Sequence, residues 1–277
     1  GIGPGDEVIV PTLTFSATAD VVSYCGAKPI LTDIDPDTFN IKIDSIKKNL
    51  SKKTKAIIPV HYGGQSCDMD EIISISKKYN LKIIEDCAHA LGSTFLDKKC
   101  GTLGNAGCFS FYPTKIITTG EGGMISTNDF SLSKKIKSSR SHGVSLTYPE
   151  REKKATWKYD ILQLGFNYRL DEIRSSLGLS QLSRIKQINS LRIKIAKKYN
   201  SALRKIKGIE IPFTESNRNH IYHLYTIKIT KDFPLSRDEL FDQLYAKGIG
   251  TSVQYVPLHD MSYNKKLNLN SNNFPFA

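Results

Sequence analysis

The chain has 277 residues, of which 39% are apolar and 24% charged; this balance excludes a disordered or fibrous protein and predicts one large core with a smaller unit. Its net charge of +12 comes from lysines spread over the whole chain without a zinc-finger or RNA-recognition motif, so it favours anionic metabolites over nucleic acid. No apolar run approaches the roughly 18 residues of a membrane helix. The five cysteines include no Cys-x-x-Cys pair, which predicts free thiols. We therefore expect a cytoplasmic protein.

From its start as far as Phe130, the chain alternates short runs rich in β-branched residues with helix-like stretches, a pattern typical of a parallel sheet covered by helices. Buried strands are predicted at residues 7–11, 29–34, 56–60 and 81–85, and helices at 16–24, 43–50 and 69–79. Asp68 and Glu71 have the spacing of a capping box at the start of the third helix. The predicted fold class is α/β, a mostly parallel sheet with flanking helices, and ligands are expected at the carboxyl ends of its strands.

The second half of the chain has a different pattern. Apolar residues three or four positions apart predict a long amphipathic helix over residues 170–206 with one break. After it, residues 222–229 and 251–255 are predicted as strands and 237–247 as a helix, which indicates a small α+β domain. We therefore expect a large domain at 1–190 and an incomplete C-terminal domain at 191–277, with an irregular tail at 267–277.

Two residues stand out for their chemistry. Asp86 follows a buried strand, where an unpaired carboxylate is costly and a cationic partner is required. Lys115 comes further along the chain, between an apolar run and a glycine-rich turn, where a lysine can lose its proton and act as a nucleophile. Taken alone, each has a structural alternative, because Asp86 could cap a helix and Lys115 could be a surface residue beside a turn.

Asp86 and Lys115 together form the pair that pyridoxal phosphate requires, since this cofactor binds a lysine covalently and needs an acidic partner for its pyridine nitrogen. Around them the sequence resembles the DegT/DnrJ/EryC1/StrS family of sugar aminotransferases, which have fold type I of the aspartate aminotransferase superfamily. The resemblance covers nearly the whole chain, in blocks that follow the family's order: GIGPGDEV (1–8), PTLTF (11–15), EDCAHALG (85–92), SFYPTKIITTGEGG (110–123), GFNYR (165–169) and GIGT (248–251).

The resemblance implies a role for each matching residue. Lys115 matches the family's Schiff-base lysine, and Asp86 matches the carboxylate that pairs with the pyridinium nitrogen. His89 matches a position beside the ring hydroxyl of the cofactor, and Ser110 matches a serine that binds its phosphate. Phe15 matches an aromatic residue that stacks on the ring.

Asn167 matches a residue that reaches the cofactor phosphate of the neighbouring subunit, so the resemblance implies a homodimer with shared active sites. Structural roles stay open for three of these residues. Phe15 could be a core residue, His89 a satisfied core histidine, and Asn167 a turn former ahead of the long helix.

The spacing of the other histidines gives no metal-ligand pattern, so no metal is expected. His61 and His259 fall in blocks that resemble loops near the family's active site. We therefore expect these two side chains to contact substrate.

The resemblance implies a pyridoxal phosphate-dependent aminotransferase that converts a keto group of a nucleotide-linked sugar to an amine in a ping-pong reaction, with glutamate as donor. Two alternatives stay open: a sugar dehydratase-like relative, although such relatives carry histidine in place of Lys115, and a non-catalytic protein that binds a sugar nucleotide. A third alternative is a nucleic-acid binder, which a salt titration would reveal because its affinity would fall steeply with salt concentration. Family members also carry a Gly-Thr loop and a helix ahead of the block that starts at Gly1, so we expect an internal fragment.

Overall fold

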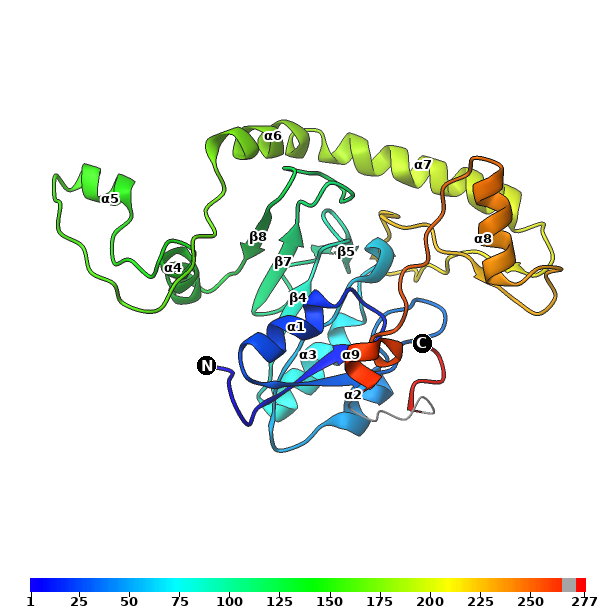
Figure 1. The fold of residues 1–277 in the computed structure, drawn as a ribbon, viewed down its shortest axis with the longest axis horizontal. Helices are drawn as coiled ribbons and strands as arrows, with labels where there is room; N and C mark the ends of the chain where they lie inside the picture. Colours follow the sequence, from blue (N-terminus) through cyan, green and yellow to red (C-terminus); the bar gives the residue numbers. More distant parts are fainter. Residues whose placement is uncertain (266–272) are drawn as a thin grey trace.

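A six-stranded sheet with helices on both faces forms the N-terminal half of the computed structural model, which describes residues 1–265 and 273–277 (Figure 1). Its strands are β1 (Glu7–Pro11), β2 (Lys28–Thr32), β3 (Thr54–Ile57), β4 (Lys82–Asp86), β7 (Ala106–Ser110) and β8 (Gly123–Ser126). The helices between the first four strands are α1 (Ala17–Tyr24), α2 (Ile43–Asn49) and α3 (Met69–Tyr79). The strand order is β2-β1-β3-β4-β7-β8, and only β8 is antiparallel, which confirms the predicted mostly parallel α/β sheet.

β1 shows why helices cover both faces of this sheet. Successive side chains of a strand point to opposite faces, and here both faces are apolar. Ile9 packs against α2 and α3 on one face, whereas Val8 and Val10 pack against α1 on the other. Full burial of such a side chain stabilises the fold by about 1.5–3 kcal/mol, so this unbroken apolar run forms an inner strand between β2 and β3.

The chain leaves β8 through an arm that carries α4 (Phe130–Ser139) and α5 (Tyr148–Lys153) and extends away from the sheet (Figure 1). It returns as α6 (Glu172–Leu182) and α7 (Ile185–Leu203), which confirm the predicted long helix with one break. Ile185 and Ile188 of α7 pack on Phe111, Ile116 and Ile117, and this contact holds the loop after β7 in place.

Shorter elements complete the chain: β5 (Thr94–Phe95), β6 (Lys98–Lys99), β9 (Ile209–Glu210), β10 (Arg218–Asn219), β11 (Lys228–Ile229), α8 (Arg237–Ala246), α9 (Ser262–Lys265) and the 3-10 turns η1 (Tyr62–Gly64) and η2 (Leu258–Asp260). The predicted helix at 237–247 is confirmed as α8, where Ser236 and Glu239 form a capping box. No helix in residues 1–265 or 273–277 has both the length and the apolar character needed to cross a bilayer.

The two strands predicted in the C-terminal part are wrong. Within 222–229 only Lys228 and Ile229 form a strand, and residues 251–255 form none. The N–H groups of Ile221 and Leu224 instead donate to the carbonyl oxygens of Gly64 and Gly63, at 3.2 and 3.1 Å. These bonds attach the segment to the η1 turn and occupy the donors that a neighbouring strand would need.

The predicted capping box at the start of α3 is also wrong, although the helix itself spans Met69–Tyr79 as predicted. Asp68 occupies the N-cap position, but its side chain makes no capping hydrogen bond. Its carboxylate lies 3.6 Å from Nη2 of Arg218, and Glu71 lies 3.6 Å from Lys47 of α2. Both carboxylates therefore form ion pairs with residues outside α3 in place of the predicted capping hydrogen bonds.

Part of the predicted irregular tail at 267–277 lies outside the described residues. Within the described part, Phe274 is buried and stacks on the ring of His259, with ring centres 4.3 Å apart. The last residues therefore pack on η2. The division into domains at 1–190 and 191–277 stays a prediction.

Candidate active site

Asp86 ends β4 at the carboxyl edge of the sheet, as predicted. Its N–H donates to the carbonyl oxygen of Pro59 at 2.8 Å, and its own carbonyl accepts from the N–H of His61 at 3.1 Å. One carboxylate oxygen accepts from the N–H of Ala88 at 3.0 Å, and the other accepts from Oγ1 of Thr18 at 2.9 Å. Both donors are neutral, and in the described part of the chain no basic side chain lies within 4.0 Å of this carboxylate.

Lys115 lies in the loop that follows β7. Its N–H donates to the carbonyl oxygen of Tyr112 at 2.9 Å, and the neighbouring Ile116 and Ile117 are buried. The Lys115 side chain is half-buried, and burial lowers the pKa of its amine, although the Asp86 carboxylate acts in the opposite direction. The fold therefore brings these two residues within electrostatic reach, and its net effect is a lowered pKa, which makes the neutral, nucleophilic form of the lysine easier to reach than in water.

His89 is buried beside this pair, between two other rings. The ring centre of His223 lies 4.5 Å from that of His89, and the hydroxyl of Tyr255 lies 3.1 Å from its Nε2. The N–H of Gly63 donates to Nδ1 at 3.4 Å, which assigns the ring proton to Nε2. Burial, then electrostatic interaction with His223 and Lys115, lowers the pKa of His89, so this ring is neutral at physiological pH.

The other three predicted site residues differ in how close they come to this group. Phe15 is 63% exposed, and its ring centre lies 6.3 Å from that of Tyr255. Ser110 ends β7, the strand that pairs with β4, and its Oγ accepts from the N–H of Tyr112 at 3.3 Å. Asn167 is exposed on the arm, where its backbone pairs with Ser141. Within the described residues, no side-chain hydrogen bond joins Asn167 to the other predicted residues.

His61 and His259 are core residues, and the expected substrate contacts are wrong. His61 is 0% exposed, with Nε2 3.0 Å from the carboxylate of Glu85 and Nδ1 accepting from the N–H of Cys67 at 3.0 Å. His259 is 5% exposed, and its Nδ1 lies 2.8 Å from Oγ1 of Thr12. Buried polar groups require such partners, and both rings already have them.

His61, Glu85 and Cys87 are also the kind of residues that bind metals, and their ligand atoms lie within 4.8 Å of one another. The Glu85 carboxylate, however, already accepts from His61 at 3.0 Å and from the backbone N–H groups of Gly101, Leu103 and Gly104 at 2.7 to 2.8 Å. These hydrogen bonds hold the pKa of Glu85 below its ordinary value, although burial alone would raise it. The cluster therefore fastens the 101–104 loop to β4, directly beside Asp86.

Sequence reasoning did not place three residues of this site, namely Thr18, His223 and Tyr255. Thr18 binds Asp86 from α1, while His223 and Tyr255 reach His89 from the distant C-terminal part of the chain. Their positions depend on how the C-terminal segment docks on η1. No local spacing in the sequence signals that contact.

Two histidines, His220 and His223, predict acid-sensitive stability. Burial, then the charges of Lys115 and Arg192, lowers the pKa of His223 to about 3, and burial lowers that of His220 to about 4. An unfolded histidine binds its proton near pH 6.5, so between about pH 6.5 and 4 the unfolded chain holds more protons, and the free energy of unfolding falls as the pH falls.

We expect His223 to account for a loss of about 2 kcal/mol between pH 6.5 and pH 5, measured by denaturant titration. In the His223→Asn variant the free energy of unfolding should depend less steeply on pH, by the contribution of about one proton, since an amide does not titrate. Equal slopes in the parent protein and the variant would mean that His223 is not held neutral by the fold.

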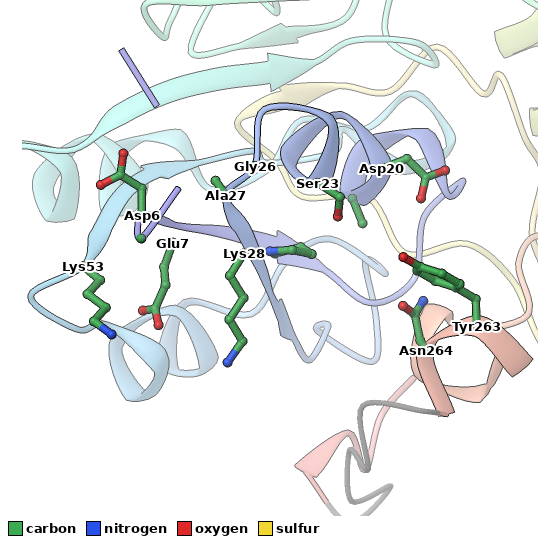
Figure 2. A pocket seen from close by; sticks show the side chains of 13 residues that line it. Asp6, Glu7, Asp20, Ser23, Gly26, Ala27, Lys28, Lys53, Tyr263 and Asn264 are labelled. Carbon is green, nitrogen blue, oxygen red and sulfur yellow. The ribbon is translucent and has the colours of Figure 1, made fainter. Parts of the chain in front are cut away.

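A cavity of about 380 Å³ lies at the amino ends of β1 and β2 (Figure 2). Asp86 ends the parallel strand β4, so it lies at the opposite edge of the sheet. Charges of both signs line it, including Glu7, Lys28 and Lys53, and Tyr263 and Asn264 of α9 lie at one side. None of the six predicted site residues contributes to its lining. This cavity is therefore separate from the candidate active site.

Comparison with known proteins identifies the family to which the sequence is similar. The model described as the DegT/DnrJ/EryC1/StrS aminotransferase family matches residues 1–277. The chain is similar to GDP-perosamine synthase from Caulobacter vibrioides, at 41% identity over 94% of this chain and 68% of that protein. It is similar to the spore coat polysaccharide biosynthesis protein SpsC from Bacillus subtilis, at 39% identity over 96% of this chain and 69% of that protein.

A solved structure shows the same fold. The Streptococcus pneumoniae protein Spr1654, in its PLP form, matches with a TM-score of 0.90 at 30% identity, and the match covers 99% of this chain and 73% of that one. The described sheet order and the flanking helices are therefore those of fold type I. With a family match over every residue, this chain belongs to the DegT/DnrJ/EryC1/StrS aminotransferase family, and its cofactor is pyridoxal phosphate.

Proposed function

We propose that this chain carries the catalytic residues of an enzyme that converts a keto group of a nucleotide-linked sugar to an amine, with glutamate as amino donor. The observation that carries the proposal is the approach of the half-buried Lys115 to Asp86 at the carboxyl edge of the sheet. The substrate class is supported by the GDP-perosamine synthase relative, which is named for a GDP-linked product. The net charge of +12 suits an anionic, nucleotide-linked substrate.

The residues at this edge fit pyridoxal phosphate. Among the described residues the Asp86 carboxylate has only neutral donors, from Thr18 and Ala88, so its negative charge remains available to a protonated ring nitrogen. Burial favours the neutral amine of Lys115, the form that bonds to an aldehyde carbon. Phe15 is exposed and free to cover an aromatic ring.

When bound, the cofactor supplies an electron sink for the bonds that break at the amino carbon of the substrate. Asp86 would hold the proton on the ring nitrogen, because an anion there stabilises the cation. The amine of Lys115 would take the proton from the donor's carbon and pass it to the cofactor, and in the second half it would move a proton from the cofactor to the sugar carbon, as a general base and acid. His89 would face the ring hydroxyl with Nε2–H, and Oγ of Ser110 would bind the phosphate.

Asn167 would reach the cofactor phosphate of a second copy of the chain in a homodimer. The arm and α6 expose large apolar side chains that support such an interface, among them Trp157, Leu164, Phe166 and Ile173. An apolar surface of this kind on a folded chain is typical of a contact with another protein. The homodimer, like the cytoplasmic location, stays a prediction.

The substrate class is tested by comparing a nucleotide-linked keto sugar with the same sugar in free form, with glutamate as donor. We expect the free sugar to be much poorer, because binding of the remote nucleotide contributes energy that positions the reacting carbon. Formation of the amino sugar and of 2-ketoglutarate is followed by mass spectrometry. Equal rates on both sugars, or activity only on small 2-keto acids, would point to an amino-acid aminotransferase.

A further inference from the structure

A second cavity, of about 190 Å³, lies between α7 and the segment at 222–225. Arg192, Ala196 and Tyr199 of α7 line one side, and His223 and Tyr225 belong to the other. Liquid water occupies about 30 Å³ per molecule, so this cavity has room for about six waters. It is too small for a whole nucleotide-linked sugar, and its volume suits one small group of a larger ligand.

Arg192 supplies a charge to this cavity. Nη1 donates to the carbonyl oxygens of Tyr222 and His223, both at the long distance of 3.4 Å. Within residues 1–265 and 273–277, no carboxylate lies within 4.0 Å of this guanidinium. Burial lowers the pKa of Arg192, which shows that its charge lacks full solvation. An arginine in this state has donors left for an oxyanion.

The rest of the lining does not oppose an anion. Of the residues that the structure describes, no acidic one lines the cavity. Burial raises the pKa of Tyr225 to about 12, so its hydroxyl stays neutral, and it donates to the side-chain oxygen of Asn200 at 2.7 Å. Within the described chain, Nδ1 of His223 is buried without a hydrogen-bond partner. A polar atom in this state is costly unless a ligand or water satisfies it.

His223 also connects the cavity to the candidate active site. Its ring centre lies 4.5 Å from that of His89, and the charges of Lys115 and Arg192 both act on its ring. A ligand group bound by Arg192 is therefore one aromatic ring away from His89 and within electrostatic reach of the residues around Lys115.

We propose that this cavity is an oxyanion-binding subsite of the active site, in which Arg192 binds a carboxylate or phosphate group of a substrate. The two sources are a dicarboxylate amino donor and the diphosphate of a nucleotide-linked sugar. The assignment of a source rests on the proposed function, whereas the binding of an oxyanion at Arg192 does not.

The test is calorimetric titration of the purified protein with inorganic diphosphate and, separately, with the dicarboxylate glutarate. We expect saturable binding of at least one of them, weakened about tenfold or more in Arg192→Gln, because that variant loses charge-assisted hydrogen bonds. Lys194→Gln is the matched control, since it removes an exposed charge from the same helix, and it should change the affinity less than about twofold. Arg192→Lys keeps the charge and should fall between these variants.

Binding of diphosphate alone assigns the cavity to the nucleotide-linked substrate, and binding of glutarate alone assigns it to the donor. If neither ligand saturates the protein, or if Arg192→Gln and Lys194→Gln weaken binding equally, the subsite does not exist. Circular dichroism and melting temperature of each variant check that the fold is retained, and Arg192→Lys decides the matter if Arg192→Gln unfolds. Arg192-dependent binding in a protein that aminates no keto sugar would overturn the proposed function and leave the subsite standing.

Discussion

Replacing Lys115 with alanine is expected to lower the rate of transamination by about 10⁴-fold or more, because the variant lacks both the nucleophile and the proton carrier. The fold should remain, since burial disfavours the charged amine of Lys115, and the backbone hydrogen bond to Tyr112 is kept. Alanine therefore removes a partly desolvated group without leaving a hydrogen-bond partner unsatisfied. Initial rates of glutamate-dependent amine formation measure the effect.

Lys135→Ala is the control for this experiment, because Lys135 is a lysine on α4 in the exposed arm. It should leave the rate within about twofold of the parent, as surface charges contribute little. A Lys115→Ala protein that folds normally and retains most of the parent's rate would exclude Lys115 from the chemistry.

Replacing Asp86 with asparagine should cost at least about 10³-fold in rate, which corresponds to about 4 kcal/mol of transition-state stabilisation. The neutral amide would no longer hold the proton on the ring nitrogen of the cofactor. The side-chain oxygen of asparagine can still accept from the N–H of Ala88, so the end of β4 should keep its conformation. Near-normal turnover of a correctly folded variant would remove Asp86 from the mechanism.

Asp70→Asn is the matched control for this substitution, because Asp70 is exposed in the first turn of α3 and contributes to neither cavity. We expect its rate to stay close to that of the parent. Its stability should fall by less than about 1 kcal/mol, through the lost interaction of an acidic residue with the helix dipole.

The sheet could be predicted from the sequence because short apolar runs mark its strands, as with residues 8–10 in β1 and Ile83 and Ile84 in β4. The predicted strand at 7–11 coincides with β1, and the run at 81–85 differs from β4 by one residue. The C-terminal strands failed for a different reason. At the start of the 222–229 segment the N–H groups of Ile221 and Leu224 donate to Gly64 and Gly63 of the η1 turn, and a pattern of side chains does not show which partner a backbone donor will meet.

The candidate site was predictable to the extent that its residues end neighbouring strands. Asp86 ends β4, and Ser110 ends β7, which pairs with β4 in the sheet, so both lie at one edge. The expected substrate contact of His61 was wrong because this side chain points into the core. There its ring is hydrogen-bonded to the carboxylate of Glu85. Tyr255 and His223 were missed because their contacts with His89 join distant parts of the chain and depend on the docking of the C-terminal segment.

Of the proposed site residues, Lys115 has the most directly testable role, because we propose that it binds the cofactor covalently. Borohydride reduction of the protein loaded with pyridoxal phosphate fixes the cofactor covalently to the lysine that holds it, and peptide mapping by mass spectrometry identifies that lysine. We predict the reduced pyridoxyl group on Lys115, with none on the same peptide from Lys115→Ala. A pyridoxyl group on another of the chain's lysines, with Lys115 unmodified, would contradict the account.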